Sequence, residues 1–275
     1  MERLNTLGIV GVGLIGASLG MAVRQRGLAR EVVGVDIDAQ AIAVAVERGA
    51  IDRGGSDVEM LRGAELVIMA VPPDSVAREA LRVAAVVNPG AILTDVASTK
   101  GVIVRTLEER LPANVRYIGG HPMAGSEGRG AQMADASLLA GRPFLLTPTE
   151  RTDPAAVTIM TALVEQLDMQ PVLLSPDDHD ELVAQISHLP YLLAIAAVGA
   201  ATERALGVTG PAFAGLARVA ASPVELWAQI CRQNRAAIVR AIRQFRQELD
   251  QLERALGDDG LEAMLEKSRR RVPAE

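Results

Sequence analysis

The chain has 275 residues and a formal net charge of −6, which is enough length for one large domain or two modest ones. Three phenylalanines, two tyrosines and one tryptophan are too few for a base-stacking surface, and the acidic balance excludes a basic nucleic-acid or lipid footprint. The single cysteine, Cys231, excludes an internal disulfide and a cysteine-based zinc cluster, and it is typical of a reducing compartment. We therefore expect no bound metal, no nucleic-acid partner and a cytoplasmic location.

Two uncharged runs resemble membrane segments in composition. Residues 7–23 are short for a span of about 20 residues and contain five glycines, whereas residues 182–202 include Gln185, Ser187 and His188. The sequence shows no targeting signal. We expect both runs to form buried elements of a soluble protein that has no membrane partner.

From residue 4 to about 175, short apolar runs typical of strands alternate with helical stretches. The expected strands are 7–10, 31–36, 65–71, 91–96, 116–119, 143–147 and 171–174, and the helices include 14–26, 39–48, 75–87 and 154–167. This alternation predicts an α/β fold, a parallel sheet with helices on both faces. We assign residues 1–175 to such a Rossmann-type domain.

After Ser175 the strand signal disappears, and residues 176–275 are expected to form an all-α domain. The pattern predicts long helices over 178–206 and 223–256, with shorter ones near 211–221 and 261–270. The 223–256 helix carries an apolar stripe at steps of three and four residues. Together with the uncharged run 182–202, it has more apolar surface than a domain of about 100 residues readily buries. We therefore expect a homodimer formed through this helical domain.

A glycine turn follows the first strand. Gly11 permits the tight turn, Gly13 allows a pyrophosphate to approach the backbone, and Gly16 allows close helix–strand packing, with Leu14 and Ile15 beginning the helix. The helix N-terminus supplies amide donors to the pyrophosphate. The alternative is a glycine-rich strand–helix unit without nucleotide.

Asp36 ends the next predicted strand, where an acidic side chain accepts hydrogen bonds from the adenosine ribose. It also repels a 2′-phosphate, which favours NAD over NADP. Val71, Pro72 and Pro73 end a later strand at the same sheet edge and are further cofactor-binding candidates. They are equally well explained as a plain strand stop.

A second group of candidates lies in two loops that follow strands. Residues 94–101 contain Lys100, one of two lysines in the chain, and residues 119–128 surround His121 with glycines. Pro122 restricts the backbone of His121. An imidazole there suits the removal of a proton from a hydroxyl as hydride leaves the same carbon. Lys100 offers positive charge to an anionic substrate. The alternative interpretation of Lys100 is a surface charge at the start of a helix.

The sequence resembles the prephenate and arogenate dehydrogenases of tyrosine biosynthesis over nearly its whole length. The resemblance rests on motifs in order, at 11–16, 95–101, 119–125, 175–180, 187–190 and 213–227. It implies an NAD-dependent enzyme that oxidatively decarboxylates prephenate to 4-hydroxyphenylpyruvate. In the family, the histidine that matches His121 accepts the C4 hydroxyl proton, and the serine that matches Ser98 hydrogen-bonds the same hydroxyl.

The resemblance also implies substrate-binding residues. Arg218 matches the arginine that binds the ring carboxylate, and Glu127 matches a glutamate near the site entrance. His179, Asp180 and His188 match positions that line or support the substrate pocket, although His188 is explained equally well as a structural residue.

Three residues depart from the family pattern. Tyr191 stands where many prephenate-preferring members have a second histidine, Gly215 where many have an aspartate that pairs with the arginine, and Ala97 where a glycine is common. Tyr191 bears on the substrate's keto or amino group, so arogenate is an alternative substrate. Two further hypotheses are a non-catalytic NAD-binding regulatory dimer and a β-hydroxyacid dehydrogenase. β-Hydroxyacid dehydrogenases usually carry a catalytic lysine on a helix of the second domain. The only lysine there, Lys267, lies near the end of the sequence, which disfavours this hypothesis.

Overall fold

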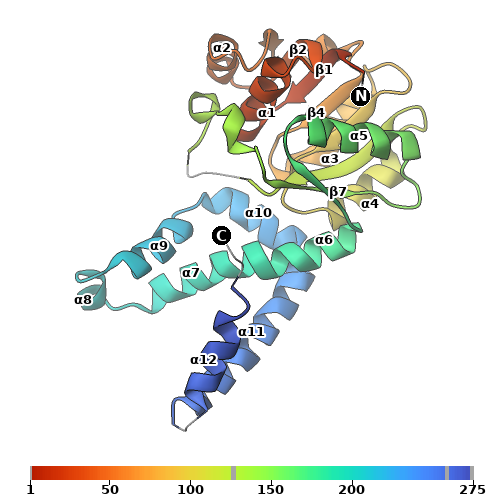
Figure 1. Ribbon diagram of the computed structural model, residues 1–275. Helices are drawn as coiled ribbons and strands as arrows, with labels where there is room; N and C mark the ends of the chain where they lie inside the picture. The colour runs from red at the N-terminus through yellow and green to blue at the C-terminus, as the bar shows by residue number, and fades with distance from the viewer. Residues whose placement is uncertain (1, 125–127, 258–259, 273–275) are drawn as a thin grey trace. The chain divides into compact units, whose positions relative to one another are not determined.

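The computed structural model describes residues 2–124, 128–257 and 260–272. By their contacts, the residues form two compact units: residues up to 183 together with 221–233, and residues 184–220 together with those from 234 onward (Figure 1). The division into domains at 1–175 and 176–275 stays a prediction, because contacts alone place two further helices with the first unit.

The first unit is built on an eight-stranded sheet in the order β3-β2-β1-β4-β5-β6-β7-β8. The strand order turns back between β1 and β4, which is the switch point where doubly wound folds bind ligands. The strands are β1 (Leu4–Val10), β2 (Ala29–Val35), β3 (Arg53–Gly55), β4 (Leu66–Met69), β5 (Ile92–Asp95), β6 (Arg116–Pro122), β7 (Pro143–Thr147) and β8 (Gln170–Leu173).

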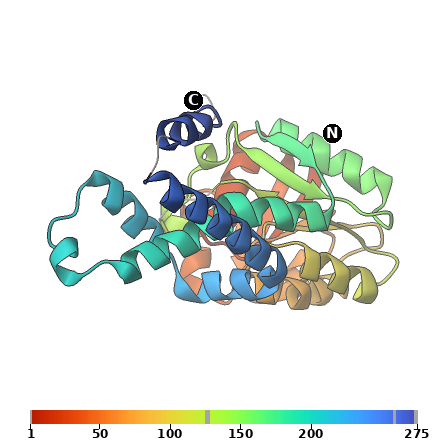
Figure 2. The same ribbon diagram turned by 90° about the horizontal axis from the view of Figure 1, so that it is seen from below.

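Helices cover both faces of this sheet, as predicted. One apolar core joins the sheet to α1 (Leu14–Gln25), α2 (Ala39–Glu47) and α5 (Pro154–Gln166). The other joins it to α3 (Pro73–Ala84) and α4 (Gly101–Arg110), so the sheet is buried on both sides (Figure 2). The unit also contains α6 (Pro176–Val183) and α10 (Val224–Gln233).

The prediction of a parallel sheet is confirmed for β1 to β6 but wrong for β7 and for β8, which pairs parallel with β7. Strand β7 pairs antiparallel with β6, with His121 opposite Leu145. A parallel return needs a long crossover, usually a helix, whereas the described part of 123–142 contains only two short 3₁₀ turns (Ala131–Met133 and Ala136–Leu138). The sequence prediction also missed β3, because Arg53–Gly55 is three residues long and two are glycines.

The second unit consists of helices. A π-helical turn (Ala184–His188) leads into α7 (Leu189–Ala200), which packs against α9 (Pro211–Ala220) and α11 (Arg235–Ala255). A short α8 (Glu203–Leu206) precedes α9, and α12 (Leu261–Arg269) packs against α11.

Both long helices expected from the sequence differ from the structure: the one over 178–206 contains a π-helical turn and ends at Ala200, and the one over 223–256 is interrupted. Pro190 has no amide to donate to the preceding turn, which accounts for the π-helical widening at Ala184–His188. The 223–256 helix breaks at Asn234 (φ −104°, ψ 28°), whose side-chain amide donates to His188 Nδ1 at 3.2 Å.

The helical run Pro176–Ala200 is long and apolar enough to cross a membrane by length and composition alone. It contains His179, Asp180 and His188, all buried with hydrogen-bonding partners in the protein. Buried, partnered polar groups are what a protein interior requires, and one such helix is weak support for a membrane span.

Candidate active site

The glycine turn has the geometry of a cofactor cradle. Gly11 adopts φ +91°, and a side chain there would meet Ala70 O at 2.3 Å, while one at Gly16 would meet Gly11 O at 2.0 Å. A side chain at Gly13, by contrast, would meet no described atom within 4 Å. In the described residues no side chain caps α1, so its first amides are left for a ligand. The turn therefore has room for a pyrophosphate at Gly13 and donors to bind it.

The Asp36 carboxylate is fixed beside this turn. Its Oδ2 accepts from Val12 N and its Oδ1 from Asp38 N, each at 2.9 Å. The Gly11 amide donates to Val35 O at 2.8 Å, which joins the turn to the end of β2. Asp36 is partly exposed, so it can also accept from a ribose hydroxyl.

The predicted site residues of the first unit lie along one edge of the sheet. Asp36 follows β2, the glycine turn follows β1, Val71 follows β4, Ser98 follows β5, and His121 lies near the end of β6. These five strands are parallel and adjacent in that order, so their carboxyl ends meet at the same edge. Pro72 and Pro73 begin α3 there, as expected of either a strand stop or a cofactor contact.

Lys100 is not the surface charge or the substrate-facing cation that the sequence suggested. Its side chain is fully buried, and Nζ donates to Asp95 Oδ1, which also accepts from Ala97 N at 2.8 Å. The Tyr117 hydroxyl donates to Asp95 Oδ2 at 2.7 Å. Burial lowers the pKa of Lys100, against the opposing effect of Asp95. This internal ion pair closes the loop that carries Ser98.

The same loop is attached to α10. The Thr99 hydroxyl donates to Gln233 Oε1 at 2.7 Å, and Gln233 Nε2 donates to Asp74 Oδ1 at 2.7 Å. Arg232 adds a contact to Asp74 Oδ2 at 3.1 Å. The contacts among Thr99, Gln233 and Asp74 were not predicted from sequence, because these residues are far apart in the chain.

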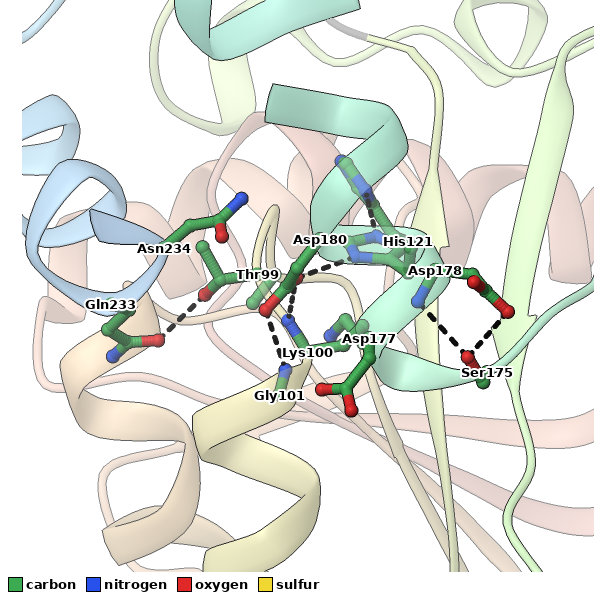
Figure 3. A network of polar contacts seen from close by, with 12 residues as sticks. Thr99, Lys100, Gly101, His121, Ser175, Asp177, Asp178, Asp180, Gln233 and Asn234 are labelled. Carbon is green, nitrogen blue, oxygen red and sulfur yellow. Dashed lines mark hydrogen bonds and ion pairs between the residues drawn. The ribbon is translucent and has the colours of Figure 1, made fainter. Parts of the chain in front are cut away.

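His121 belongs to a chain of buried polar groups (Figure 3). Its Nδ1 lies 2.9 Å from His179 Nε2, and His179 Nδ1 lies 2.9 Å from Asp180 Oδ1. Asp180 in turn accepts from the amides of Lys100 (2.8 Å) and Gly101 (2.9 Å) at the start of α4. The structure thus joins three predicted site residues into one chain.

The start of α6 holds this chain in place. Ser175 Oγ accepts from Asp178 N at 3.0 Å and donates to Asp178 Oδ2 at 2.7 Å, while His179 N donates to Ser175 O. The Ser175 hydroxyl thus bonds an amide in the first turn of α6, as an N-cap side chain does. Burial lowers the pKa of His179, against an opposing hydrogen bond to Asp180. For Asp180, burial raises the pKa, but hydrogen bonds from His179 and the two amides prevail and lower it.

The remaining candidates lie in the second unit or outside the described residues. His188 and Tyr191 are buried, on the π-helical turn and on α7, and Arg218 is exposed on α9. At Gly215 an added Cβ would meet no described atom within 4 Å. Glu127 lies outside the described residues.

A doubly wound sheet with a glycine turn at its switch point, an acidic residue after the next strand and a buried histidine at the same edge defines a nucleotide-dependent oxidoreductase. The comparisons agree. A family model for the prephenate dehydrogenase nucleotide-binding domain matches residues 19–181, and one for the prephenate dehydrogenase dimerization domain matches 175–269. The chain belongs to the prephenate dehydrogenase family and is an NAD-dependent oxidoreductase.

Individual relatives extend this result. A prephenate dehydrogenase from Bacillus subtilis is 29% identical over 260 residues, 91% of this chain and 70% of that protein. The Aquifex aeolicus prephenate dehydrogenase, crystallised with hydroxyphenyl propionate and NAD⁺, has a TM-score of 0.91 at 28% identity, covering 97% and 96% of the two chains. A Synechocystis arogenate dehydrogenase has a TM-score of 0.82 at 32% identity, covering 96% and 97%. The expected family, fold class and cofactor are thereby confirmed.

Proposed function

We propose that the enzyme oxidises and decarboxylates prephenate to 4-hydroxyphenylpyruvate. The observation that carries this proposal is the buried His121 at the sheet edge that also bears the glycine turn and Asp36. Bound NAD supplies the hydride acceptor. Loss of the ring carboxylate as carbon dioxide makes the ring aromatic, so the chain's own residues need only orient the substrate and remove one proton.

In this proposal each candidate has one task. His121 accepts the proton of the C4 hydroxyl, and Ser98 hydrogen-bonds the same oxygen. Arg218 binds the ring carboxylate through its guanidinium, which suits the planar geometry of that group. His179 and Asp180 support the site, whereas Lys100 acts from within the protein by holding the loop of Ser98.

The geometry at Asp36 supports a preference for NAD over NADP. Two backbone amides fix the carboxylate beside the glycine turn, where a 2′-phosphate would meet a negative charge. The next residue, Ile37, is 96% exposed and offers no positive charge to offset that repulsion. We expect Asp36→Ser to lower the preference for NAD, measured as kcat/KM with NAD divided by kcat/KM with NADP.

Arogenate is the second candidate substrate, with tyrosine as the direct product. It is favoured by the departure at Tyr191, which is buried where many prephenate-preferring relatives carry a histidine. The Synechocystis arogenate dehydrogenase also resembles the chain. Comparing kcat/KM for prephenate and arogenate, each with NAD and NADP, decides between the two. A preference for arogenate would overturn the leading proposal.

The role of His121 is tested separately. His121→Asn keeps a polar side chain but removes the base, so turnover should fall by at least 10²-fold, as is typical when general-base catalysis is lost. NAD affinity should change little. Normal turnover in this variant would contradict the role, and NAD binding without turnover in the unmodified protein would favour a non-catalytic regulatory dimer.

We further propose a homodimer formed through the helical unit and a cytoplasmic location. The match to a dimerization domain and exposed apolar side chains on α11 (Leu249) and α12 (Leu265) support the dimer. The single cysteine supports a reducing compartment. Sedimentation of the protein across a dilution series tests the dimer, and a monomer at all concentrations would contradict it.

A further inference from the structure

In the hydrogen-bonded series Asp180–His179–His121, the donor and the acceptor of each hydrogen bond can be assigned from the groups that contact Asp180. Asp180 accepts from two backbone amides, which can only donate, and its carboxylate form is further favoured by these bonds. A carboxylate cannot donate, so the 2.9 Å contact to His179 Nδ1 requires the hydrogen to be on His179. The first link therefore runs from His179 to Asp180.

The second link follows from the first. Burial favours neutral His179 by lowering its pKa, and a neutral imidazole carries one hydrogen. With that hydrogen on Nδ1, His179 Nε2 can only accept. The 2.9 Å contact with His121 Nδ1 then requires the hydrogen to be on His121 Nδ1, which leaves its lone pair on Nε2.

We infer that His179 and Asp180 are positioning residues that fix His121 in the Nδ1–H tautomer and thereby make Nε2 the proton-accepting atom. The use of Nε2 in catalysis rests on the proposed function; the tautomer does not. Without the hydrogen bond to His179, His121 would favour the Nε2–H form that imidazoles prefer in water. Its lone pair would then lie on Nδ1 and not on Nε2. In serine proteases, a histidine held in the wrong tautomer costs about 10⁴-fold in kcat.

The surroundings of these hydrogen-bonded residues favour the charged form of Asp180. Asp180 lies at the N-terminus of α4, whose dipole favours a carboxylate. The charged and titratable groups that act on His179 are Asp180 from α6, Asp95 from β5 and Lys100 from the start of α4. Lys100 is paired with Asp95, so Asp180 is the carboxylate that stabilises the positive charge developing on His121 as it takes a proton.

The direct test is spectroscopic and benefits from the composition. The chain has three histidines, so ¹⁵N-histidine labelling gives a spectrum of only His121, His179 and His188. At neutral pH we expect the ring-nitrogen shifts of His121 and His179 to show a protonated Nδ1 and an unprotonated Nε2. Substituting each histidine assigns the signals. A protonated Nε2 on His121 would overturn the inference, whatever the activity.

Kinetics of three variants provide the second readout. His179→Leu removes the acceptor for His121 Nδ1–H and should lower kcat by about 10²- to 10³-fold with little change in KM. In His179→Gln the side-chain oxygen can still accept, so kcat should recover partly. Asp177→Asn is the matched control, because it removes a carboxylate from the same helix at an 86% exposed side chain outside the chain of polar groups.

A merely structural role for His179 would give a different pattern. His179→Leu and His179→Gln would then lose activity in proportion to their loss of thermal stability, and His121 would keep its tautomer in both. We expect His179→Leu to populate the Nε2–H form of His121 while remaining folded. An unchanged His121 spectrum in folded His179→Leu contradicts the inference. Absence of turnover with prephenate and arogenate would instead refute the proposed function and leave the tautomer result standing.

Discussion

Replacing Lys100 by Met tests how the loop that carries Ser98 is held. Methionine keeps the length of the buried stem but removes the ammonium, so the Asp95 carboxylate stays in the interior without its counter-charge. Removing one partner of a buried ion pair typically costs about 3–5 kcal/mol. Asp95 retains two donors, Ala97 N and the Tyr117 hydroxyl, which favours the lower part of that range.

We therefore expect Lys100→Met to lower the free energy of unfolding by about 3 kcal/mol, or Tm by roughly 6–12 °C for a protein of this size. Urea denaturation followed by circular dichroism measures the first, and calorimetry measures the second. The control is Arg105→Met on α4, whose ion pair with Asp177 spans 3.4 Å between exposed side chains. An exposed pair of this kind contributes at most about 1 kcal/mol.

The double variant Lys100→Met with Asp95→Asn makes the test specific to charge. Because it leaves no uncompensated carboxylate, it should be more stable than Lys100→Met alone. A loss in Lys100→Met no larger than that in Arg105→Met would refute the assignment of a buried ion pair. So would a double variant whose loss is the simple sum of the two single losses.

Three further predictions concern the cofactor turn and the polar chain. Gly13→Ala should keep its Tm but bind NAD at least tenfold more weakly, because the new Cβ enters the space left for the pyrophosphate; unchanged NAD affinity by calorimetry would contradict this. Gly16→Ala, unlike Gly13→Ala, should lower Tm, since its Cβ would lie 2.0 Å from Gly11 O. Equal Tm values for the two variants would contradict this steric argument. The lowered pKa of His179 means that the unfolded chain takes up this proton first as pH falls below about 6.5, so stability should decline from that pH downward. His179→Gln should flatten this part of the Tm–pH curve, and an unchanged slope would assign it to other groups.

The parts of the fold that were predictable from sequence are those governed by local periodicity. Buried strands and intervening helices produce repeating apolar patterns, so the positions of β1, α1, β2 and the glycine turn follow from the order of residues alone. The direction of β7 does not, because it depends on the path of the connection from His121 and not on the residues of the strand. The break at Asn234 also escaped prediction, since the apolar residues continue at helical spacing on both sides of it.

The same distinction holds for the candidate site. His121 was identifiable because a histidine among glycines at a strand end is unusual material for a core. The family resemblance pointed to His179 and Asp180 but not to their order, which required the distances between their ring and carboxylate atoms. Lys100 was misjudged because a lysine at a helix start is usually solvated, and only the structure shows Asp95 beside it.

The most direct test of the proposed function is to follow NADH formation and carbon dioxide release together, in one reaction of the purified protein with prephenate and NAD. We expect both products to form in equal amounts and both to disappear in His121→Asn. NADH without carbon dioxide, or neither product with prephenate, would contradict it.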